Sequence, residues 1–229
     1  SIFTGSGGNP DLGPYRASQF DISAEWYYAP ESLLSVAVFF KDIQSYHVNA
    51  TNPERQRVET NTPNLSRCTL ISGNLYECTF DMTRPTNGAG GRNQGIELTW
   101  QQPIWNGFGA IVNYTYLHSE SDSDVPIPGA SKHSANITGY YENDRFSARL
   151  SWNYRSKFFV DYDVERGFRP LFMDDTWSLD GSVQVNVTEN IALTLDAVNL
   201  TDEVIEEFYD DDPGRPARFY KNGRVFWAG

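Results

Sequence analysis

The sequence has no purely apolar run long enough to cross a membrane as a helix. Such a helix needs about 20 consecutive apolar residues, whereas only 39% of the residues are hydrophobic and the mean hydropathy is −0.51. This balance excludes a bundle of membrane helices. It fits either a membrane barrel whose inward positions are wet or a soluble protein rich in β-strands.

Positive charge is also scarce. The 229 residues include 18 Lys and Arg against 30 Asp and Glu, which gives a formal net charge of −12. Proteins that bind nucleic acid need clustered Lys and Arg to neutralise phosphates. The composition therefore excludes nucleic acid from the expected partners.

Catalytic motifs are missing from the sequence. It contains no Gly-x-Ser-x-Gly, P-loop, Cys-x-x-Cys or His-Glu-x-x-His pattern. The spacing of its three histidines, His47, His118 and His133, does not indicate a metal site. We therefore expect a protein that is not an enzyme and that uses no cofactor or metal.

Cysteine is limited to Cys68 and Cys78, in a segment rich in Thr, Asn and Ser. We favour a disulfide between them over two free thiols, and a disulfide would indicate an oxidising compartment. The first residues lack the charged and apolar stretches of a signal peptide, so we expect a mature chain or a fragment.

The sequence does contain a regular alternation of polar and apolar side chains. Within residues 146–158, Leu150 and Trp152 alternate with Arg149, Ser151 and Asn153. A period of two places successive side chains on opposite faces of a β-sheet. A dozen residues tilted by about 45° also span close to the ~25 Å apolar band of an outer membrane. The pattern predicts a wall with lipid on one side and water on the other.

Nine such strands are predicted, and their connections alternate between short and long. The strands are 18–29, 33–46, 93–103, 108–119, 132–142, 146–159, 176–187, 191–201 and 217–229. Bacterial outer-membrane barrels place short turns in the periplasm and long loops outside. We therefore expect residues 47–92, 120–131, 160–175 and 202–216 to face the exterior. The predicted fold class is all-β: an antiparallel meander of about nine strands that forms part of a large transmembrane β-barrel.

Three short segments resemble one family. They are 8–15 (GNPDLGPY), which leads into a strand, 128–136 (PGASKHSAN), which enters one, and 198–203 (VNLTDE), which leaves one. Together they resemble the C-terminal barrel portion of TonB-dependent outer-membrane receptors, and residues 220–224 (YKNGR) are similar to the last hairpin of that family. The two prolines and the Asx-type geometry of the first segment aim the chain into the next strand, and the third segment can cap a strand end.

The resemblance implies that residues 1–229 are the C-terminal portion of a 22-stranded barrel, with the plug domain and the earlier strands absent. It implies an outer-membrane receptor of a Gram-negative bacterium that takes up a scarce nutrient with energy from TonB. The implied partners are the remaining strands and plug of the same receptor, the TonB complex through that plug, outer-membrane lipid and lipopolysaccharide, and a small-molecule nutrient.

Ligand contact is expected from residues at the lumen and in the exterior segments. The candidates are Tyr46, His118, Arg155, Lys157, Asp161 and Tyr162. Aromatic rings suit sugar stacking, whereas Arg and Lys suit an anionic chelate, so both a saccharide and a siderophore stay open. The acidic exterior segments favour a neutral saccharide, and we interpret their carboxylates as solvated charge rather than as a Ca²⁺ site. The alternative function is a secreted, disulfide-containing all-β binding module similar to a lectin.

Overall fold

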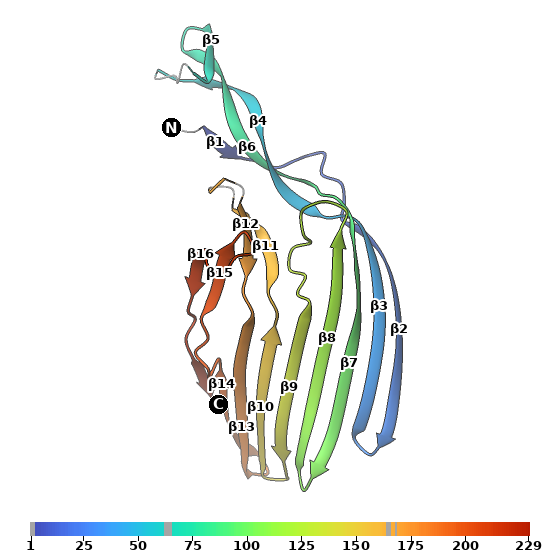
Figure 1. Ribbon diagram of the computed structural model, residues 1–229. Helices are drawn as coiled ribbons and strands as arrows, with labels where there is room; N and C mark the ends of the chain where they lie inside the picture. Colours follow the sequence, from blue (N-terminus) through green and yellow to red (C-terminus); the bar gives the residue numbers. More distant parts are fainter. Residues whose placement is uncertain (1–2, 62–65, 164–165, 168) are drawn as a thin grey trace. The chain divides into compact units, whose positions relative to one another are not determined.

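A computed structural model describes residues 3–61, 66–163, 166–167 and 169–229. Every regular element in that part of the chain is a β-strand (Figure 1), which confirms the all-β prediction. The same residues include no helix long and apolar enough to cross a membrane. The chain divides into two compact units. Unit 1 comprises Ser1–Ala17 and Ile43–Gly90, and unit 2 comprises Ser18–Asp42 and Gly91–Gly229.

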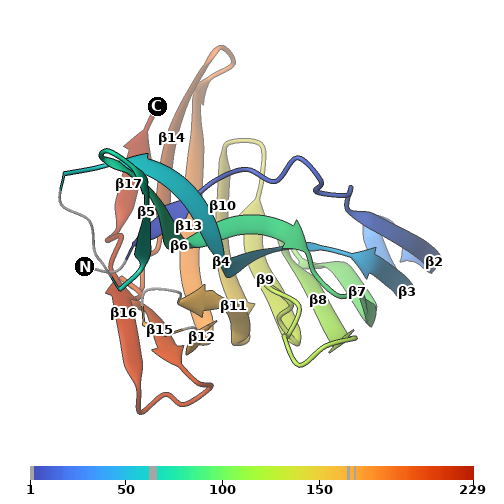
Figure 2. The same ribbon diagram turned by 90° about the horizontal axis from the view of Figure 1, so that it is seen from above.

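The largest sheet has nine strands, in the order β17-β14-β13-β10-β9-β8-β7-β3-β2. Its strands are β2 (Arg16–Ala29), β3 (Ser32–Ser45), β7 (Gly91–Trp105), β8 (Phe108–Ser121), β9 (His133–Glu142), β10 (Phe146–Arg155), β13 (Thr176–Thr188), β14 (Ile191–Val198) and β17 (Val225–Ala228). From β7 to β17 each pair of neighbours is antiparallel. Figure 2 shows these strands following one another from above. The sheet is the predicted meander.

Two of the predicted strand ranges are wrong in extent. The strand expected over 146–159 ends at Arg155, because Lys157 leaves the ladder and its backbone N–H donates to Asp175 Oδ1 at 2.7 Å. The strand expected over 217–229 is divided in two, and Gly223, with a φ of 74°, lies in the break. That φ lies in the left-handed region that glycine adopts at little cost.

The short connections of the large sheet are built from turn residues. Asn106 and Gly107 form the two-residue loop between β7 and β8, with φ of 47° and 84°. Positive φ at both positions is the requirement of a type I′ turn, whose twist matches that of the flanking strands. Between β9 and β10, Asn143 Oδ1 accepts the backbone N–H groups of Arg145 and Phe146 at 2.9 and 2.8 Å.

The two faces of the large sheet are chemically different. One face carries a row of successive register partners from β7 to β13, namely Trp100, Val112, Ile137, Trp152 and Leu179. Many apolar side chains on this face are open to the surroundings, and Leu150 is 50% exposed. The other face presents polar side chains at the intervening positions. The alternation predicted for residues 146–158 therefore continues across the sheet.

A second sheet, here called the small sheet, has the order β11-β12-β15-β16. Its strands are β11 (Phe158–Asp163), β12 (Arg169–Met173), β15 (Ile205–Tyr209) and β16 (Pro216–Tyr220). They lie in two of the three long connections of unit 2, which we define as residues 122–132, 156–175 and 199–224. Phe159 and Phe208 are 3% and 2% exposed on one face of this sheet, where the ring of Phe172 contacts both, and Leu171, 3% exposed, is buried on the other face. Segments expected as loops thus contain a sheet with its own buried residues.

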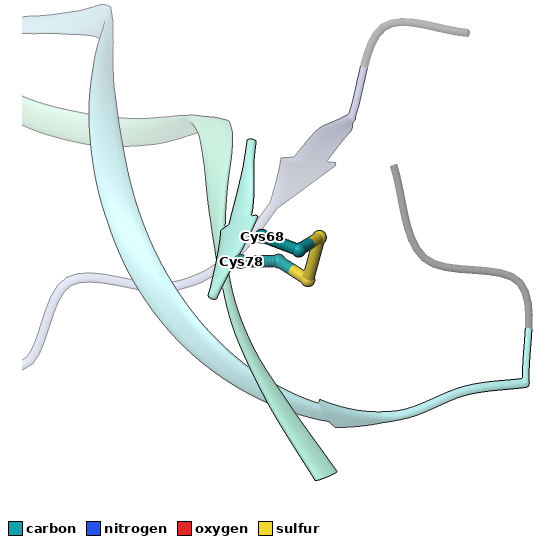
Figure 3. The surroundings of a disulfide bond; sticks show 2 residues. All are labelled: Cys68 and Cys78. Carbon is teal, nitrogen blue, oxygen red and sulfur yellow. A yellow bond between two sulfur atoms is a disulfide. The ribbon is translucent and has the colours of Figure 1, made fainter. Parts of the chain in front are cut away.

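Unit 1 contains the third sheet. β4 (His47–Glu59) pairs antiparallel with β6 (Leu75–Asn87) over the whole of β4, and the short strands β1 (Thr4–Ser6) and β5 (Cys68–Ser72) pair with β6 on its other side. Cys68 and Cys78 are directly opposed in β5 and β6 and are joined by a disulfide (Figure 3). The segment 47–92, expected as a loop, is therefore mostly strand.

Candidate functional site

The polar face of the large sheet carries a row of hydrogen-bonding side chains that crosses five strands. The successive register partners are Thr99, Asn113, Asn136, Asn153 and Ser178. Asn136 Nδ2 donates to Asn153 Oδ1 at 2.6 Å, and Asn153 Nδ2 donates to Asp180 Oδ2 at 2.8 Å. Side chains that orient one another in this way form a pre-arranged polar surface. The row can bind water or the hydroxyl and amide groups of a ligand.

Arg155, at the end of β10, joins two of the long connections. Its Nε donates to Ser131 Oγ at 2.7 Å and one terminal nitrogen donates to the Gly129 carbonyl at 2.5 Å. Its guanidinium lies 3.8 Å from the centre of the Phe158 ring, a distance suited to a cation–π contact. The Gly129 N–H also donates to the Phe159 carbonyl at 2.9 Å. Arg155 was predicted to contact ligand, and in the structure it holds residues 122–132 against β11.

Lys157 is also engaged within the protein. Its Nζ lies 2.8 Å from Asp211 Oδ1, and both side chains are about half exposed. Asp175, which accepts the backbone N–H of Lys157, also accepts the hydroxyl of Tyr154 at 2.7 Å. Asp175 and Asp211 therefore connect the end of β10 and the residue Lys157 that follows it to the connections 156–175 and 199–224.

Asp210 is the centre of the charge pairs beside the small sheet. Arg169 and Arg215 each place a guanidinium nitrogen 2.6 Å from Asp210 Oδ2. The hydrogen bonds from Arg169 are the main reason why the pKa of the Asp210 carboxyl lies below its ordinary value; desolvation is the next largest effect and opposes them, and the hydrogen bond from Arg215 lowers the pKa further. The φ of 60° at Asp210 is tolerated by aspartate in turns. Two cations on one carboxylate fix the end of β15.

A second group of charges lies along β15 and β16. Tyr209 donates its hydroxyl to Asp163 Oδ2 at 2.7 Å, and this bond is the main reason why the pKa of Asp163 is lowered. Arg218 lies 3.6 Å from Glu207 Oε2 and 3.9 Å from Asp163 Oδ2. Glu207 is a buried carboxylate at 4% exposure, and burial of a charge is tolerated where it is paired. These contacts join β11, β15 and β16, three of the four strands of the small sheet.

The other predicted ligand residues lie in different places. Asp161 and Tyr162 belong to β11, where Tyr162 packs edge-on against Phe159 with ring centres 5.2 Å apart. His118 lies on the apolar face of β8, on the same side as Tyr116, and pairs with Glu120 at 3.0 Å. Tyr46 belongs to unit 1 and is 6% exposed. The structure therefore places Arg155, Lys157, Asp161 and Tyr162 in β10, in β11 or between these strands, and it places His118 on the apolar face.

Two of the family-like segments, residues 8–15 and 198–203, have structural roles. In residues 8–15, Asn9 Oδ1 accepts the backbone N–H of Asp11 at 3.0 Å, and Asn9 Nδ2 donates to the Pro85 carbonyl at 3.0 Å. In residues 198–203, Asn199 Oδ1 accepts the backbone N–H of Glu203 at 2.9 Å, and Asn199 Nδ2 donates to the Gly223 carbonyl at 3.0 Å. The predicted Asx turn and strand-end cap are confirmed.

Arginine and glutamate hold the strands of unit 1 together. Arg84 donates to both oxygens of Glu54, at 2.7 and 2.9 Å, and also to the Gly8 carbonyl. The paired hydrogen bonds lower the pKa of Glu54 and raise that of Arg84. One guanidinium thus fastens the segment before β2 to the β4–β6 hairpin.

The acidic residues of the long connections do not form a metal site in the described part of the chain. No group of three or more His, Cys, Asp and Glu side chains there is arranged to hold a metal ion. Several of these carboxylates instead face arginine or lysine, as at Asp163, Asp202, Asp210 and Asp211. Our interpretation of them as merely solvated charge missed these pairs.

The ion pairs of the small sheet were missed because their partners are distant in the sequence. Arg169 and Asp210 are 41 positions apart in the sequence. A local sequence pattern relates only residues that are a few positions apart, so it could not indicate this pair. The only local signal was the run Asp210-Asp211-Asp212-Pro213-Gly214, whose composition indicates a turn. It did not indicate which cations the turn would receive.

Comparison with known proteins gives one family and several similar folds. The family model described as "TonB dependent receptor-like, beta-barrel" matches residues 1–200. No curated protein matches the sequence. Similar solved structures include the siderophore receptor PirA from Acinetobacter baumannii (TM-score 0.64, 15% identity), the ferric enterobactin receptor PfeA from Pseudomonas aeruginosa (0.63, 14%) and the ferric-catecholate import receptor Fiu from E. coli (0.59, 17%).

These matches cover 96–97% of this chain but only 28–32% of the three receptors. The chain therefore spans about a third of the length of the receptor structures that it resembles. At these identities the likeness concerns the fold.

Proposed function

Because the chain belongs to the TonB-dependent receptor-like β-barrel family, we propose that residues 1–229 are the C-terminal portion of the barrel of an outer-membrane receptor. In this proposal the plug domain and the earlier strands lie outside this sequence. The receptor lies in the outer membrane of a Gram-negative bacterium and takes up a scarce nutrient with energy delivered by TonB.

The observation that carries the proposal is the pair of unlike faces of the nine-stranded sheet. Leu150, Leu193 and Leu195 are each 50–57% exposed on the apolar face, which would be costly in water over so wide an area. A bilayer removes that cost, while the polar row at Asn136 and Asn153 suits a wet lumen. Strands with lipid on one side and water on the other are typical of a membrane barrel wall.

The activity that follows is binding and transport rather than bond chemistry. The proposed partners are the other strands and the plug of the same receptor, the TonB complex through that plug, membrane lipid and lipopolysaccharide, and the nutrient. The long connections lie at the end of the sheet opposite the short turns, so we infer that they face the exterior and meet the ligand first.

The ligand is a small nutrient, with a saccharide and a siderophore as the candidate classes. PirA, PfeA and Fiu are described as receptors for siderophores or ferric chelates, which supports the second class. Asp161 and Tyr162 of β11 are proposed contacts, and the side chains of Arg155 and Lys157, which already bind within the protein, would have to exchange those contacts for the ligand.

The test uses the full-length receptor. We expect it to fractionate with outer membranes and to migrate faster in unboiled than in boiled detergent gels, because a closed barrel resists unfolding by detergent. Recovery as a water-soluble protein without heat-dependent migration would contradict the proposal and would favour the secreted binding module.

A further inference from the structure

The net charge of the chain comes from only one of its two units. Unit 1 contains five Arg and five Asp or Glu, so its formal net charge is zero. Unit 2 contains 13 Lys and Arg against 25 Asp and Glu and carries the whole net charge of −12. Its three long connections contain eight basic and 14 acidic residues, a net charge of −6. The ligand of the proposed receptor would meet this surplus of carboxylates.

The basic side chains of the long connections are largely used within the protein. Lys157 and Lys221 lie 2.8 Å from Asp211 and Asp202. Arg169 and Arg215 share Asp210, as described above, and Arg215 also lies 3.4 Å from Asp212. Arg218 faces Glu207 and Asp163, and Arg224 Nε donates to the Leu200 carbonyl at 2.9 Å.

Arg155, which borders these connections, is engaged in the same way. Its donors are directed at Ser131 Oγ and at the Gly129 carbonyl, and its face is covered by Phe158. Binding of a phosphate, carboxylate or catecholate normally uses such donors. An anionic ligand at Arg155 would have to share the guanidinium with these contacts.

Among the described residues, many carboxylates of the same segments form no ion pair. Those that form no ion pair with another described residue are Asp122, Asp124, Asp161, Asp174, Asp175, Glu203 and Glu206. Uncompensated charges of one sign set up a potential that concentrates cations and depletes anions nearby. The engagement of the basic side chains and the surplus of unpaired carboxylates therefore both disfavour the binding of an anion.

We propose that the long connections of unit 2 select against ligands with a net negative charge, so that the nutrient is neutral or cationic. This inference rests on the proposed receptor function. It admits neutral saccharides and neutral or cationic iron chelates, and it excludes anionic ferric tricatecholates.

The local potential can be measured without knowledge of the ligand. A thiol-reactive fluorophore is attached to Ser123→Cys in residues 122–132 or to Val204→Cys in residues 199–224 of the full-length receptor in proteoliposomes. Quenching by caesium, iodide and acrylamide is compared with that of the free dye. We expect the caesium-to-iodide ratio to rise about threefold over the free dye at 0.1 M salt. The ratio should fall at 1 M salt, where the Debye length is about 3 Å.

Asn52→Cys in unit 1 is the matched control, because that unit carries no net charge. Its caesium-to-iodide ratio should stay close to that of the free dye. The double variant Asp122→Asn and Asp124→Asn should reduce the effect at position 123. Equal ratios at positions 52, 123 and 204, or a preference for iodide at 123 and 204, would overturn the inference.

A ligand experiment completes the test. Tryptophan fluorescence of the full-length receptor is titrated with a ferric tricatecholate probe, and no saturable binding is expected. Saturable binding would overturn the inference while leaving the receptor function intact. Failure to fractionate with outer membranes would instead contradict the receptor function. Because fractionation is measured separately from the quenching ratios and from this titration, the two failures can be told apart.

Discussion

The nine-stranded sheet and the small sheet are made of the same element but are stabilised in different ways. The large sheet leaves its apolar side chains open on one face, as at Leu150, whereas the small sheet buries Phe159, Leu171 and Phe208. The large sheet is held by long antiparallel ladders, and the small sheet adds ion pairs around Asp210 and Arg218. The small sheet buries its apolar side chains within the protein, whereas the exposed apolar face of the large sheet fits the membrane wall proposed above.

The largest expected effect is at the core of the small sheet. Phe208→Ala should cost about 3–5 kcal/mol of its local stability, because it removes a nearly fully buried ring. Hydrogen exchange should report opening of β11, β12, β15 and β16 while heat-dependent gel migration of the barrel is kept. The control is Phe219→Ala on β16, since Phe219 is exposed. Loss of barrel migration in the Phe208 variant would show that the two sheets are not independent.

The second prediction separates the two faces of the large sheet. Leu150→Arg should lower stability in bilayers by about 2–4 kcal/mol, because it places a charge against lipid. Ser151→Arg should cost about 1 kcal/mol, the value of the hydrogen bond that Ser151 forms with Thr138. Urea unfolding in vesicles measures both.

A polarity-sensitive dye at each position decides whether the apolar face contacts lipid. A lipid-soluble quencher should reach the dye at 150 and not at 151. Protection of both positions would contradict the membrane wall.

The third prediction concerns the disulfide of unit 1. Replacing Cys68 and Cys78 by Ala should destabilise the β5–β6 hairpin by about 2–3 kcal/mol, because the ten-residue closure no longer restricts the unfolded chain. Limited proteolysis should cut residues 47–90 faster, and the large sheet should be unaffected. Free thiols in the native receptor, detected by thiol titration, would refute the bond.

The fourth prediction treats Arg155 as a positioning residue. Arg155→Lys cannot supply donors to both Ser131 and Gly129, and we expect it to cost about 1 kcal/mol locally. Proteolysis within residues 122–132 should accelerate. Arg149→Lys is the control, because Arg149 forms only an exposed pair with Glu142. If Arg155 contacts ligand instead, the variant will weaken binding without changing proteolysis.

The smallest effect is a pH dependence of the small sheet. The pKa of Asp210 is lowered in the folded protein by Arg169 and Arg215. A lowered folded pKa contributes stability that is present above the ordinary aspartate pKa and is lost as the pH falls through the folded value. Hydrogen exchange of β15 should therefore quicken below about pH 4. Asp210→Asn should quicken exchange at neutral pH and flatten this dependence, and an unchanged profile would argue against the pairing.

Much of the large sheet could be predicted because its information is local. Alternation within a strand and turn residues such as Asn106-Gly107 specify faces and hairpins over a few residues. The small sheet could not be predicted in this way. Its strands are only five or six residues long, and β12 pairs with β15 across more than 30 intervening residues.

The candidate site also has features that local sequence predicts and features that only distant contacts decide. The sequence singled out six candidate ligand contacts, and the structure places four of them, Arg155, Lys157, Asp161 and Tyr162, in and beside β10 and β11. It did not reveal that Arg155 would bind Ser131 and Gly129, since those contacts cross to another connection. His118 lies at alternate positions of the same strand with Tyr114 and Tyr116, so the alternation of side chains could have predicted its place on the apolar face.

The sequence by itself determined the all-β class, the order of the large hairpins, the unlike faces of the strands and the net charge of −12. Each depends on composition or on neighbours within a few residues. The tertiary structure alone decided how the charges are shared, because a cation such as Arg169 becomes committed only when folding brings Asp210 within 2.6 Å. It also decided that the long connections would build a sheet with buried residues, since Phe159 and Phe208 come to the same face only when β12 aligns both of them with Phe172.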